Sequence, residues 1–325
     1  MSAENVEVFE VSVAARRELA AGVVAFELAR ADGSALAPWT PGSHLDVLLP
    51  GGIERQYSLC GGTSTGSPWR IGVLREPAGR GGSIQLHDSA TVGTKLRVRG
   101  PRNHFPFAPE AGARIIFVAG GIGITPILPM VREAAARALD WTLLYAGRSR
   151  QTMAFVDELL AYHPERVRIH AADEGQRLEL SVLAADSRPG PGARLAVYGC
   201  GPARLLDGVE DAFAGYHGVS VHLERFTPKE NGAPVYNGPF EVELQQTGVT
   251  VTVTEGRTIL EAVEEVGAFV LSSCREGTCG TCETPIVSGT ADHRDSVLTA
   301  AEQAENRVMM VCVSRAACSR LVLDL

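Results

Sequence analysis

Four cysteines near the carboxyl end of the sequence constrain its fold more than any other feature. They follow the pattern C-x4-C-x2-C, with a fourth after 29 intervening residues, and are Cys274, Cys279, Cys282 and Cys312. This spacing is typical of plant-type [2Fe–2S] sites, in which four thiolates hold two irons. A domain built around such a site brings three ligands from one curled loop and the fourth from a later segment.

The residues between these cysteines suit a loop wrapped around an inorganic cluster. Gly277 and Gly280 permit backbone conformations that other residues rarely adopt. Small residues around them can let backbone N–H groups approach sulfur; they are Ser272, Ser273, Thr278 and Thr281. Cys312 lies in the apolar run 308–313, which predicts a strand. The alternatives are buried free thiols or a structural zinc site, which more often shows two separated CxxC-like pairs.

The length of 325 residues predicts two or three domains rather than one core. An apolar content of 45% and a mean hydropathy of +0.05 are typical of a globular protein in water. No apolar run approaches the length of a membrane span, and the acidic start of the chain does not resemble a signal peptide. Seven cysteines, an odd number, indicate a reducing cytoplasm rather than a disulfide framework. We expect a cytoplasmic monomer.

The net charge of −8 argues against a nucleic-acid partner. The segment 240–325 has 13 acidic and 6 basic residues, a net charge of −7, which leaves −1 for the rest of the chain. An acidic carboxyl-terminal part could dock on a basic partner protein. A solvated acidic surface that only aids solubility is the alternative.

Residues from about 6 to 107 predict many short strands separated by glycine and proline clusters. The expected strands are 8–14, 23–28, 44–49, 56–59, 69–73 and 95–99. Regular short strands with such turns predict a closed antiparallel β-barrel.

The motif RQYS at residues 55–58 supplies the groups that a flavin needs. Strand alternation places Arg55 and Tyr57 on one face, and Gln56 and Ser58 on the other. A cation for a phosphate, an aromatic surface and small hydrogen-bonding groups are therefore present together. By itself the motif is weak evidence, because a tyrosine on a strand is usually a core residue.

A second motif, GRGGS at residues 79–83, precedes a short helix expected at 84–88. Backbone N–H groups, a guanidinium, a hydroxyl and a helix N-terminus together suit a phosphate. A glycine-rich loop alone is usually only a turn. Two such motifs in one barrel predict flavin phosphate binding.

From about residue 114 the pattern changes to alternating strands and helices, which predicts a doubly wound parallel sheet that binds a nucleotide. Strands are expected at 115–119, 141–145, 167–171 and 195–198, with one helix ending at 138 and another at 155–161.

The loop GGIGITP at residues 120–126 lacks the full G-x-G-x-x-G fingerprint. It still brings glycines and the Thr125 hydroxyl to a helix N-terminus, where a pyrophosphate could approach. After the next strand, Arg148 and Arg150 could contact the adenosine ribose or its phosphate, and exposed loop cations are the alternative. No acidic ribose-binding residue directly follows that strand, so these residues leave NADH against NADPH open.

The carboxyl-terminal third predicts a small β-grasp ferredoxin module. Residues 227–238 predict a linker, and strands at 240–244 and 249–253 predict a hairpin. A helix at 258–266 would begin with Thr258 as its N-cap and stop at Gly267. The expected domains are a barrel at 1–110, an α/β domain at 111–228, a linker at 229–238 and a ferredoxin at 239–325.

The whole chain resembles the reductases of class IA Rieske oxygenase systems, the family of phthalate dioxygenase reductase and vanillate O-demethylase reductase. The resemblance rests on six motifs in the family's order: RQYS at 55–58, GRGGS at 79–83, GGIGITP at 120–126, YGCGP at 198–202, ERF at 224–226 and the cysteine pattern. It implies FMN rather than FAD, because FAD-using relatives carry a longer flavin site and often an amino-terminal ferredoxin. It also implies NADH.

The resemblance implies roles for single residues. The flavin would be lined by Arg55, Gln56, Tyr57 and Ser58, its phosphate held by Arg80, Gly81, Gly82 and Ser83, and its ring covered by Phe226. The pyridine nucleotide would contact Gly121, Gly123, Thr125 and Pro126, with Cys200, Gly201 and Pro202 beside the nicotinamide. The residues expected closest to the reacting atoms are Ser58, Thr125 and Cys200. For Ser58 the alternative is a strand hydroxyl satisfied by backbone.

We therefore predict an NADH-dependent oxidoreductase in which FMN takes up two electrons and passes them singly to a [2Fe–2S] cluster. The cluster would then reduce a terminal Rieske-type oxygenase or O-demethylase of aromatic catabolism. The redox groups carry the chemistry and the protein positions them. Two alternatives are a non-enzymatic redox sensor or carrier, for which no output domain is evident, and a reductase that serves a cytochrome P450.

Overall fold

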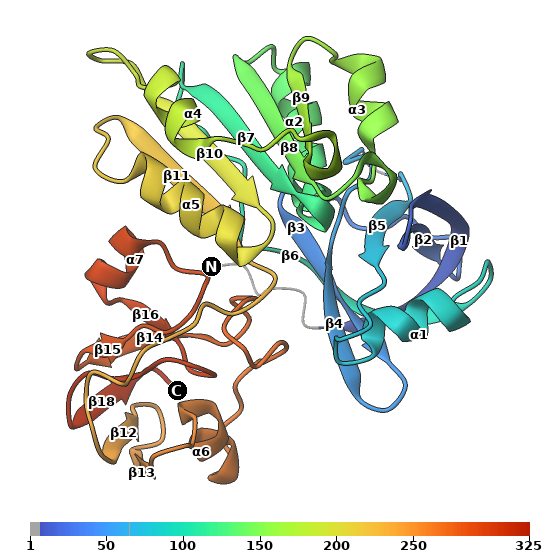
Figure 1. Ribbon diagram of the computed structural model, residues 1–325. Coiled ribbons are helices and arrows are strands. Elements are labelled where there is room, and N and C mark those ends of the chain that lie inside the picture. The colour runs from blue at the N-terminus through green and yellow to red at the C-terminus, as the bar shows by residue number, and fades with distance from the viewer. Residues whose placement is uncertain (1–6, 65) are drawn as a thin grey trace. The chain divides into compact units, whose positions relative to one another are not determined.

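The computed structural model describes residues 7–64 and 66–325. The acidic segment 1–6, on which the expectation of no signal peptide rests, lies outside the described residues. The chain forms two compact units, one ending at Glu224 and one running from Arg225 to Leu325 (Figure 1).

A six-stranded antiparallel sheet forms the amino-terminal half of the first unit, in the order β4-β3-β6-β1-β2-β5. Its elements are β1 (Val8–Ala20), β2 (Val23–Arg30), β3 (Ser43–Leu49), β4 (Ile53–Ser58), β5 (Trp69–Leu74), α1 (Gly82–Ser89) and β6 (Lys95–Asn103). A bridge between Leu59 and Ile71 joins the two edges of the sheet and closes it. The predicted barrel is confirmed, with longer strands than the sequence alone indicated.

Alternation explains the barrel core. Val11, Phe26, Val47 and Val98 are fully buried because alternate residues of each strand face inward.

A five-stranded parallel sheet follows in the same unit, in the order β11-β10-β7-β8-β9. Its strands are β7 (Arg114–Gly120), β8 (Trp141–Gly147), β9 (Val167–Ala171), β10 (Leu195–Cys200) and β11 (Val219–Glu224). Its helices are α2 (Ile124–Ala136), α3 (Val156–Tyr162), α4 (Leu180–Asp186) and α5 (Ala203–Phe213), with single 3-10 turns η1 (Gly121–Gly123), η2 (Arg150–Thr152) and η3 (Ala172–Glu174). The predicted doubly wound sheet is confirmed.

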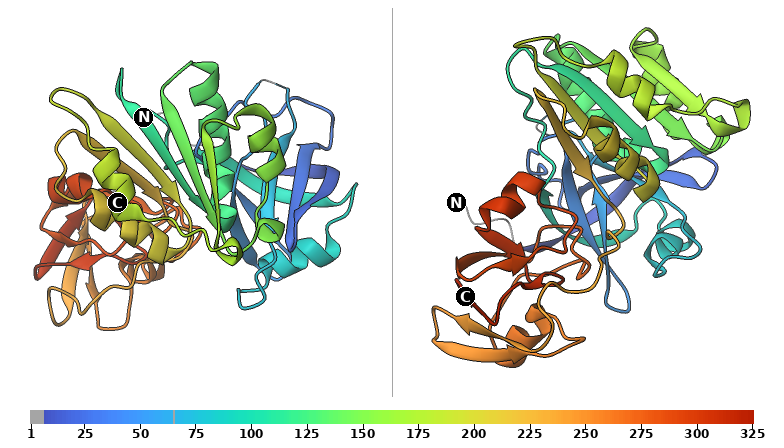
Figure 2. Two further views of the ribbon diagram at one scale, coloured as in Figure 1. Left: turned by 45° about the horizontal axis from the view of Figure 1, so that its top comes forward. Right: turned by 60° about the vertical axis from the view of Figure 1, so that its left-hand side comes forward.

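Helices cover both faces of this sheet (Figures 1 and 2). Ile115 and Phe117 of β7 pack in one cluster with residues of α2 and α3. Ile116 and Val118, which point the other way, pack with Val209 of α5. Because both faces are buried, β7 is a continuous apolar run rather than an alternating one.

The barrel and the parallel sheet share apolar core. Cys60 and Phe107 lie in the same buried cluster as Phe117 and Tyr198. The rings of Phe107 and Tyr198 meet edge to face, with centroids 5.2 Å apart. The two sheets of the first unit are therefore held together by packing, which fixes the loops at their junction.

The second unit is a mixed sheet in the order β13-β12-β18-β14-β16, with a small β15-β17 ribbon. Its elements are β12 (Phe240–Leu244), β13 (Val249–Val253), α6 (Ile259–Glu265), β14 (Glu283–Ser288), β15 (Ala291–Asp292), α7 (Ala300–Glu305), β16 (Val308–Met310), β17 (Arg315–Ala316) and β18 (Arg320–Leu323). The hairpin agrees with the predicted bounds. Thr258 is the predicted N-cap, and forms a capping box with Glu261.

Two local expectations are wrong. The strand expected at 308–313 ends at Met310, and Cys312 lies in the following turn. The turn is held by hydrogen bonds from the backbone N–H groups of Val313 and Ser314 to the carbonyl of Met310. The helix expected to reach residue 138 ends at Ala136, because Ala138 adopts a positive φ of 52°.

The segment between the sheets of the two units has no regular structure, but it is hydrogen-bonded to the second unit. The Lys229 N–H donates to the Ser296 hydroxyl at 2.9 Å, and the Arg294 guanidinium donates to the Gly232 carbonyl at 2.6 Å. Among the described residues, no helix has the length and apolar character needed to cross a membrane.

Candidate active site and iron–sulfur centre

The loops that follow β7 and β10 meet at the point where the order of the parallel sheet reverses. A Cβ on Gly123 would overlap the Cys200 carbonyl and lie 2.7 Å from the Gly201 nitrogen, and one on Gly120 would lie 2.7 Å from Pro202. The two loops can therefore lie this close together only because positions 120 and 123 are glycines. The structure thus brings Gly123 together with Cys200, Gly201 and Pro202 at the edge where doubly wound sheets bind nucleotides.

Two further groups hold the glycine loop in place. The Tyr145 hydroxyl donates to the Gly121 carbonyl at 3.1 Å, and the Thr125 hydroxyl donates to the Ile122 carbonyl at 2.9 Å. Thr125 is 2% exposed and its methyl group would lie 2.8 Å from a Cβ on Gly72 of β5. The predicted Thr125 thus lies at the junction with the barrel, followed by buried Pro126 in α2.

A buried polar cluster forms where the barrel meets this edge. Ser58, at the end of β4, hydrogen-bonds to Glu224, at the end of β11. The Cys200 thiol donates to the Glu224 carboxylate across 3.9 Å. Ser58 and Cys200 are almost fully buried. The predicted Ser58 and Cys200 are therefore brought together through a residue that the sequence analysis did not assign.

Burial controls the protonation of this cluster. Part of the Glu224 residue is exposed to solvent, but protein atoms surround its carboxylate. This desolvation raises the pKa of Glu224 to about 8. Burial also raises the pKa of the Cys200 thiol, with the adjacent carboxylate adding to the effect. At neutral pH the cluster is therefore mainly uncharged and can offer hydrogen bonds without a buried ionic charge.

Strand register explains why Glu224 is present. Cys200 and Glu224 are paired neighbours on the parallel strands β10 and β11. In the sequence, only its place as the first residue of the ERF motif pointed to Glu224. The pairing of β11 with β10 is what shows where its carboxylate lies.

The two flavin motifs also come together. The Arg55 guanidinium donates to the Arg80 carbonyl at 2.7 Å, and a Cβ on Gly82 would lie 2.5 Å from the Arg55 side chain. Gly81 adopts a left-handed conformation with φ 84°, directly before α1 begins. The Ser83 hydroxyl accepts a hydrogen bond from the Glu76 N–H at 3.1 Å. One cation, two glycines and a helix start thus share one place, as a phosphate site requires.

The other residues of the RQYS motif have protein partners. The Gln56 amide donates to Asp46 at 3.0 Å, within a buried ionic group that includes Arg102. Tyr57 packs partly buried against the barrel core, and this burial raises its pKa to about 12. Contact of Gln56 or Tyr57 with the flavin therefore stays a prediction.

An ionic clamp joins the loop after β4 to the parallel sheet. Arg132 of α2 donates to the carbonyls of Cys60 and Gly61 at 3.2 and 3.0 Å, and Arg70 of β5 donates to Cys60 at 2.8 Å. Glu158 of α3 forms ion pairs with both arginines. The clamp fixes the loop that leaves Ser58. A nearby cavity of about 540 Å³ between α2 and α3 is lined by none of the predicted site residues.

The two arginines after β8 differ in their contacts. Arg150 forms an ion pair with Glu174, with Nε and Oε1 2.7 Å apart. Arg148 is exposed, and its carbonyl accepts a hydrogen bond from the Asp173 N–H at 3.0 Å. The predicted Phe226 is 43% exposed and belongs to the second unit, so its role stays a prediction.

The four predicted cluster ligands come together in the second unit. The Cys274 thiol hydrogen-bonds to those of Cys279 and Cys312, and the Cys312 thiol hydrogen-bonds to that of Cys282. Four thiols linked by these contacts match the ligand set of a [2Fe–2S] centre. As expected for a loop wrapped around such a centre, backbone N–H groups point at sulfur: Glu276 and Thr278 donate to Cys274, and Thr281 donates to Cys279.

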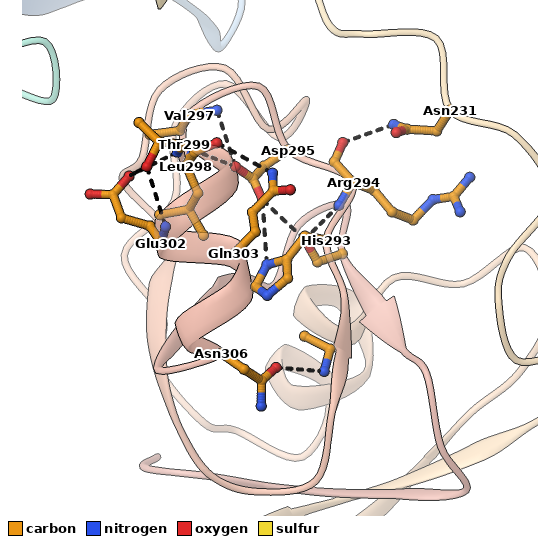
Figure 3. A network of polar contacts seen from close by, with 12 residues as sticks. Asn231, His293, Arg294, Asp295, Val297, Leu298, Thr299, Glu302, Gln303 and Asn306 are labelled. Atoms are coloured by element: carbon orange, nitrogen blue, oxygen red, sulfur yellow. Dashed lines mark hydrogen bonds and ion pairs between the residues drawn. The ribbon is translucent and has the colours of Figure 1, made fainter. Parts of the chain in front are cut away.

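The ligand loop has a second support that the sequence did not suggest. The Asp295 carboxylate accepts hydrogen bonds from the N–H groups of Val297 and Leu298 at 3.0 and 2.8 Å (Figure 3). The Ser296 N–H donates to the Gly277 carbonyl at 2.8 Å. Gly277, with φ 70°, leaves no room for a Cβ beside Val313. Asp295 therefore shapes the segment that contacts the ligand loop at Gly277, although it lies 13 residues beyond Cys282.

Models of two domain families match the chain. The 2Fe-2S iron-sulfur cluster binding domain matches residues 242–317, and the oxidoreductase NAD-binding domain matches residues 117–211.

Relatives match over nearly the whole length. The toluene-4-sulfonate monooxygenase system reductase subunit of Comamonas testosteroni is 41% identical, over 97% of this chain and 98% of its own. The vanillate O-demethylase oxidoreductase of Pseudomonas sp. strain HR199 is 40% identical, over 97% and 99%. The likeness therefore extends over nearly the full length of these relatives.

Two solved structures extend the likeness to the fold. A phthalate dioxygenase reductase superposes with a TM-score of 0.68 at 37% identity, covering 98% of each chain. An intact type IV self-sufficient cytochrome P450 monooxygenase superposes with a TM-score of 0.89 at 41% identity, covering 98% of this chain. This chain spans only 41% of that P450 protein.

FMN, NADH and a [2Fe–2S] cluster are the cofactors of phthalate dioxygenase reductase, and the residues described above fit this predicted set. The activity is that of an oxidoreductase that passes electrons from NADH through flavin to the iron–sulfur domain. The chain belongs to the family of iron–sulfur flavoprotein reductases, of the phthalate dioxygenase reductase type, that serve oxygenase systems.

Proposed function

We propose that this reductase supplies single electrons to a Rieske-type non-haem iron oxygenase or O-demethylase, and that it acts as a monomer in the cytoplasm. The observation that carries the proposal is the pair of sites in one chain. Ser58, Cys200 and Glu224 meet where the barrel joins the parallel sheet, and four thiols meet in the second unit. Seven unpaired cysteines support a reducing compartment.

We assign the flavin phosphate to the group made by Arg55 and residues 80–83. Arg55 is anchored by its bond to the Arg80 carbonyl, so its charge is held beside the start of α1. Two of the five guanidinium donors go to the Glu54 and Arg80 carbonyls, and the remaining donors with the positive charge can bind a phosphate. The adjoining glycines allow backbone N–H groups to approach the same anion.

We assign the nicotinamide to the edge formed by Gly123, Thr125, Cys200 and Gly201, next to Ser58. FMN supplies the two-electron to one-electron conversion when it is bound. The chain's own contribution is to exclude water and hold neutral hydrogen-bonding groups in place. Glu224 serves this role because its raised pKa keeps a proton on the carboxyl at neutral pH.

We assign the cluster to Cys274, Cys279, Cys282 and Cys312. The N–H groups aimed at Cys274 and Cys279 stabilise negative charge on sulfur, which is one of the ways in which a protein tunes such a centre. The domain bounds proposed from the sequence, 1–110, 111–228 and 239–325, fit these three sites.

A cytochrome P450 is the second candidate partner, because a self-sufficient P450 carries a region 41% identical to this whole chain. Turnover in a reconstituted mixture with NADH distinguishes the two candidate partners. The purified holoenzyme is mixed with a Rieske oxygenase of the vanillate type, or with a P450 haem domain lacking its own reductase, and product formed per NADH oxidised is measured.

We expect efficient coupling only with the Rieske oxygenase. Cys279→Ser should abolish that turnover while NADH oxidation by ferricyanide continues. Greater turnover with the P450 haem domain would refute the assignment of the partner.

A further inference from the structure

A carboxylate engages one of the two arginines at the nucleotide end of the parallel sheet. Glu174 is the last residue of η3, directly after β9, and Arg150 is the first residue of η2, after β8. Arg150 Nε and Glu174 Oε1 lie 2.7 Å apart. The two side chains are 44% and 38% exposed, so their pairing adds little to the stability of the fold.

Sheet topology places this pair on the nucleotide-binding edge. β7, β8 and β9 are adjacent and parallel, so the segments after their carboxyl ends lie along one edge. The Asp173 N–H donates to the Arg148 carbonyl at 3.0 Å, which ties η3 to the loop after β8. A nucleotide whose pyrophosphate lies at the glycine loop after β7 extends its adenosine ribose toward the loop after β8.

We propose that Glu174 is a specificity-determining residue that makes the reductase select NADH against NADPH. It occupies the Nε side of Arg150 and sets a negative charge where the 2′-phosphate of NADPH would approach. An arginine binds phosphate well when its planar fork is free to make two parallel hydrogen bonds. The inference rests on the proposed nucleotide site.

Of the neighbouring charges, Asp173 acts in the same direction as Glu174, and Arg148 acts against it. Asp173 adds a second exposed carboxylate on η3. Arg148 provides one exposed cation, and its own carbonyl accepts a hydrogen bond from η3. The ribose hydroxyl of NADH carries no charge, so this arrangement costs NADH little. A phosphate monoester carries about −1.5 to −2 at pH 7 and is repelled by a nearby carboxylate.

The size of the effect follows from Coulomb's law in water. A doubly charged phosphate about 5 Å from an exposed carboxylate is disfavoured on the order of tenfold. Neutralising Glu174 should therefore raise kcat/KM for NADPH about tenfold and leave that for NADH within about twofold.

The test compares Glu174→Gln with a matched control at the other end of the same strand. Glu165 precedes β9 and pairs with Arg166 across 3.8 Å, also on the surface. Full-length holoenzyme is assayed with ferricyanide as acceptor, and kcat/KM is measured for NADH and NADPH. Inhibition by 2′,5′-ADP against NADH gives a second readout, of binding alone.

We expect Glu174→Gln to raise NADPH use and to tighten 2′,5′-ADP binding by similar factors, and Glu165→Gln to change neither. Adding Arg150→Ala to Glu174→Gln should remove the gain. The inference is overturned if Glu174→Gln alters the NADPH to NADH ratio no more than Glu165→Gln does, or if it lowers NADH use without raising NADPH use. Failure of wild-type protein to oxidise NADH would instead refute the proposed function.

Discussion

The buried carboxyl of Glu224 makes the stability of the first unit depend on pH in a predictable direction. Its pKa is raised from 4.5 to about 8, chiefly by desolvation. Between these values the unfolded chain releases a proton that the folded chain keeps, so the unfolded state gains stability as pH rises. The penalty is absent below pH 4.5 and complete above pH 8.

The magnitude follows from the shift. Each pKa unit corresponds to 1.36 kcal/mol, so the complete penalty is about 5 kcal/mol and most of it develops between pH 5 and 9. Because structural relaxation and water penetration reduce such desolvation costs in real proteins, we expect about half of this, roughly 2 kcal/mol. Glu224→Gln keeps a hydrogen-bonding group beside Ser58 and Cys200 but cannot ionise, so this decline should vanish.

Urea unfolding followed by flavin fluorescence at pH 5, 7 and 9 tests the prediction, since both proposed flavin-binding motifs lie in the first unit. The free energy of unfolding of wild type minus that of Glu224→Gln should fall by about 2 kcal/mol from pH 5 to 9. The exposed Glu165→Gln variant should follow wild type at every pH. Parallel pH dependence of wild type and Glu224→Gln would refute the reasoning.

Three other predictions follow from the two sites. Gly123→Ala should raise the KM for NADH and lower stability by about 1–3 kcal/mol, because its Cβ would overlap the Cys200 backbone. Gly190→Ala is the control, since its Cβ meets nothing within 4 Å, and an unchanged KM of Gly123→Ala would contradict the site. Arg55→Ala should weaken FMN binding about tenfold or more by equilibrium dialysis and leave the visible spectrum of the cluster intact, since it removes a charged hydrogen-bonding group; equal loss on replacing exposed Arg97 would contradict this. Cys279→Ser should remove the cluster absorption while NADH–ferricyanide activity stays within about twofold, and loss of flavin instead would contradict the division of the chain.

Much of the architecture was readable from local patterns. The bounds of β12 and β13 agree with the predicted hairpin, and Thr258 caps α6 as its residue type indicated. Such features depend on neighbours in the chain, so alternation and capping rules reach them. Strand lengths were less accurate: β1 extends to Ala20 because β2 pairs along its length.

The ligands of the cluster were determined by the sequence alone, because thiolate chemistry and loop spacing are local properties. The position of Cys312 in a turn was decided by the tertiary structure, where the ladder between β14 and β16 ends at Met310. Asp295 was also invisible in the sequence. The contact of its segment with the ligand loop, from the Ser296 N–H to the Gly277 carbonyl, joins residues that lie 19 positions apart in the chain.

Only the tertiary structure placed Glu224 between Ser58 and Cys200, and Glu174 beside Arg150. In each case the carboxylate lies at or just after the end of one strand, and the residues that it contacts lie at or just after the ends of other strands. Residue type and sequence spacing carry no information on which strands are adjacent, whereas the register of β10 with β11 and of β8 with β9 determines it. The sequence thus determined which redox groups the chain can hold, and the packing of strand ends decided the charges that surround them.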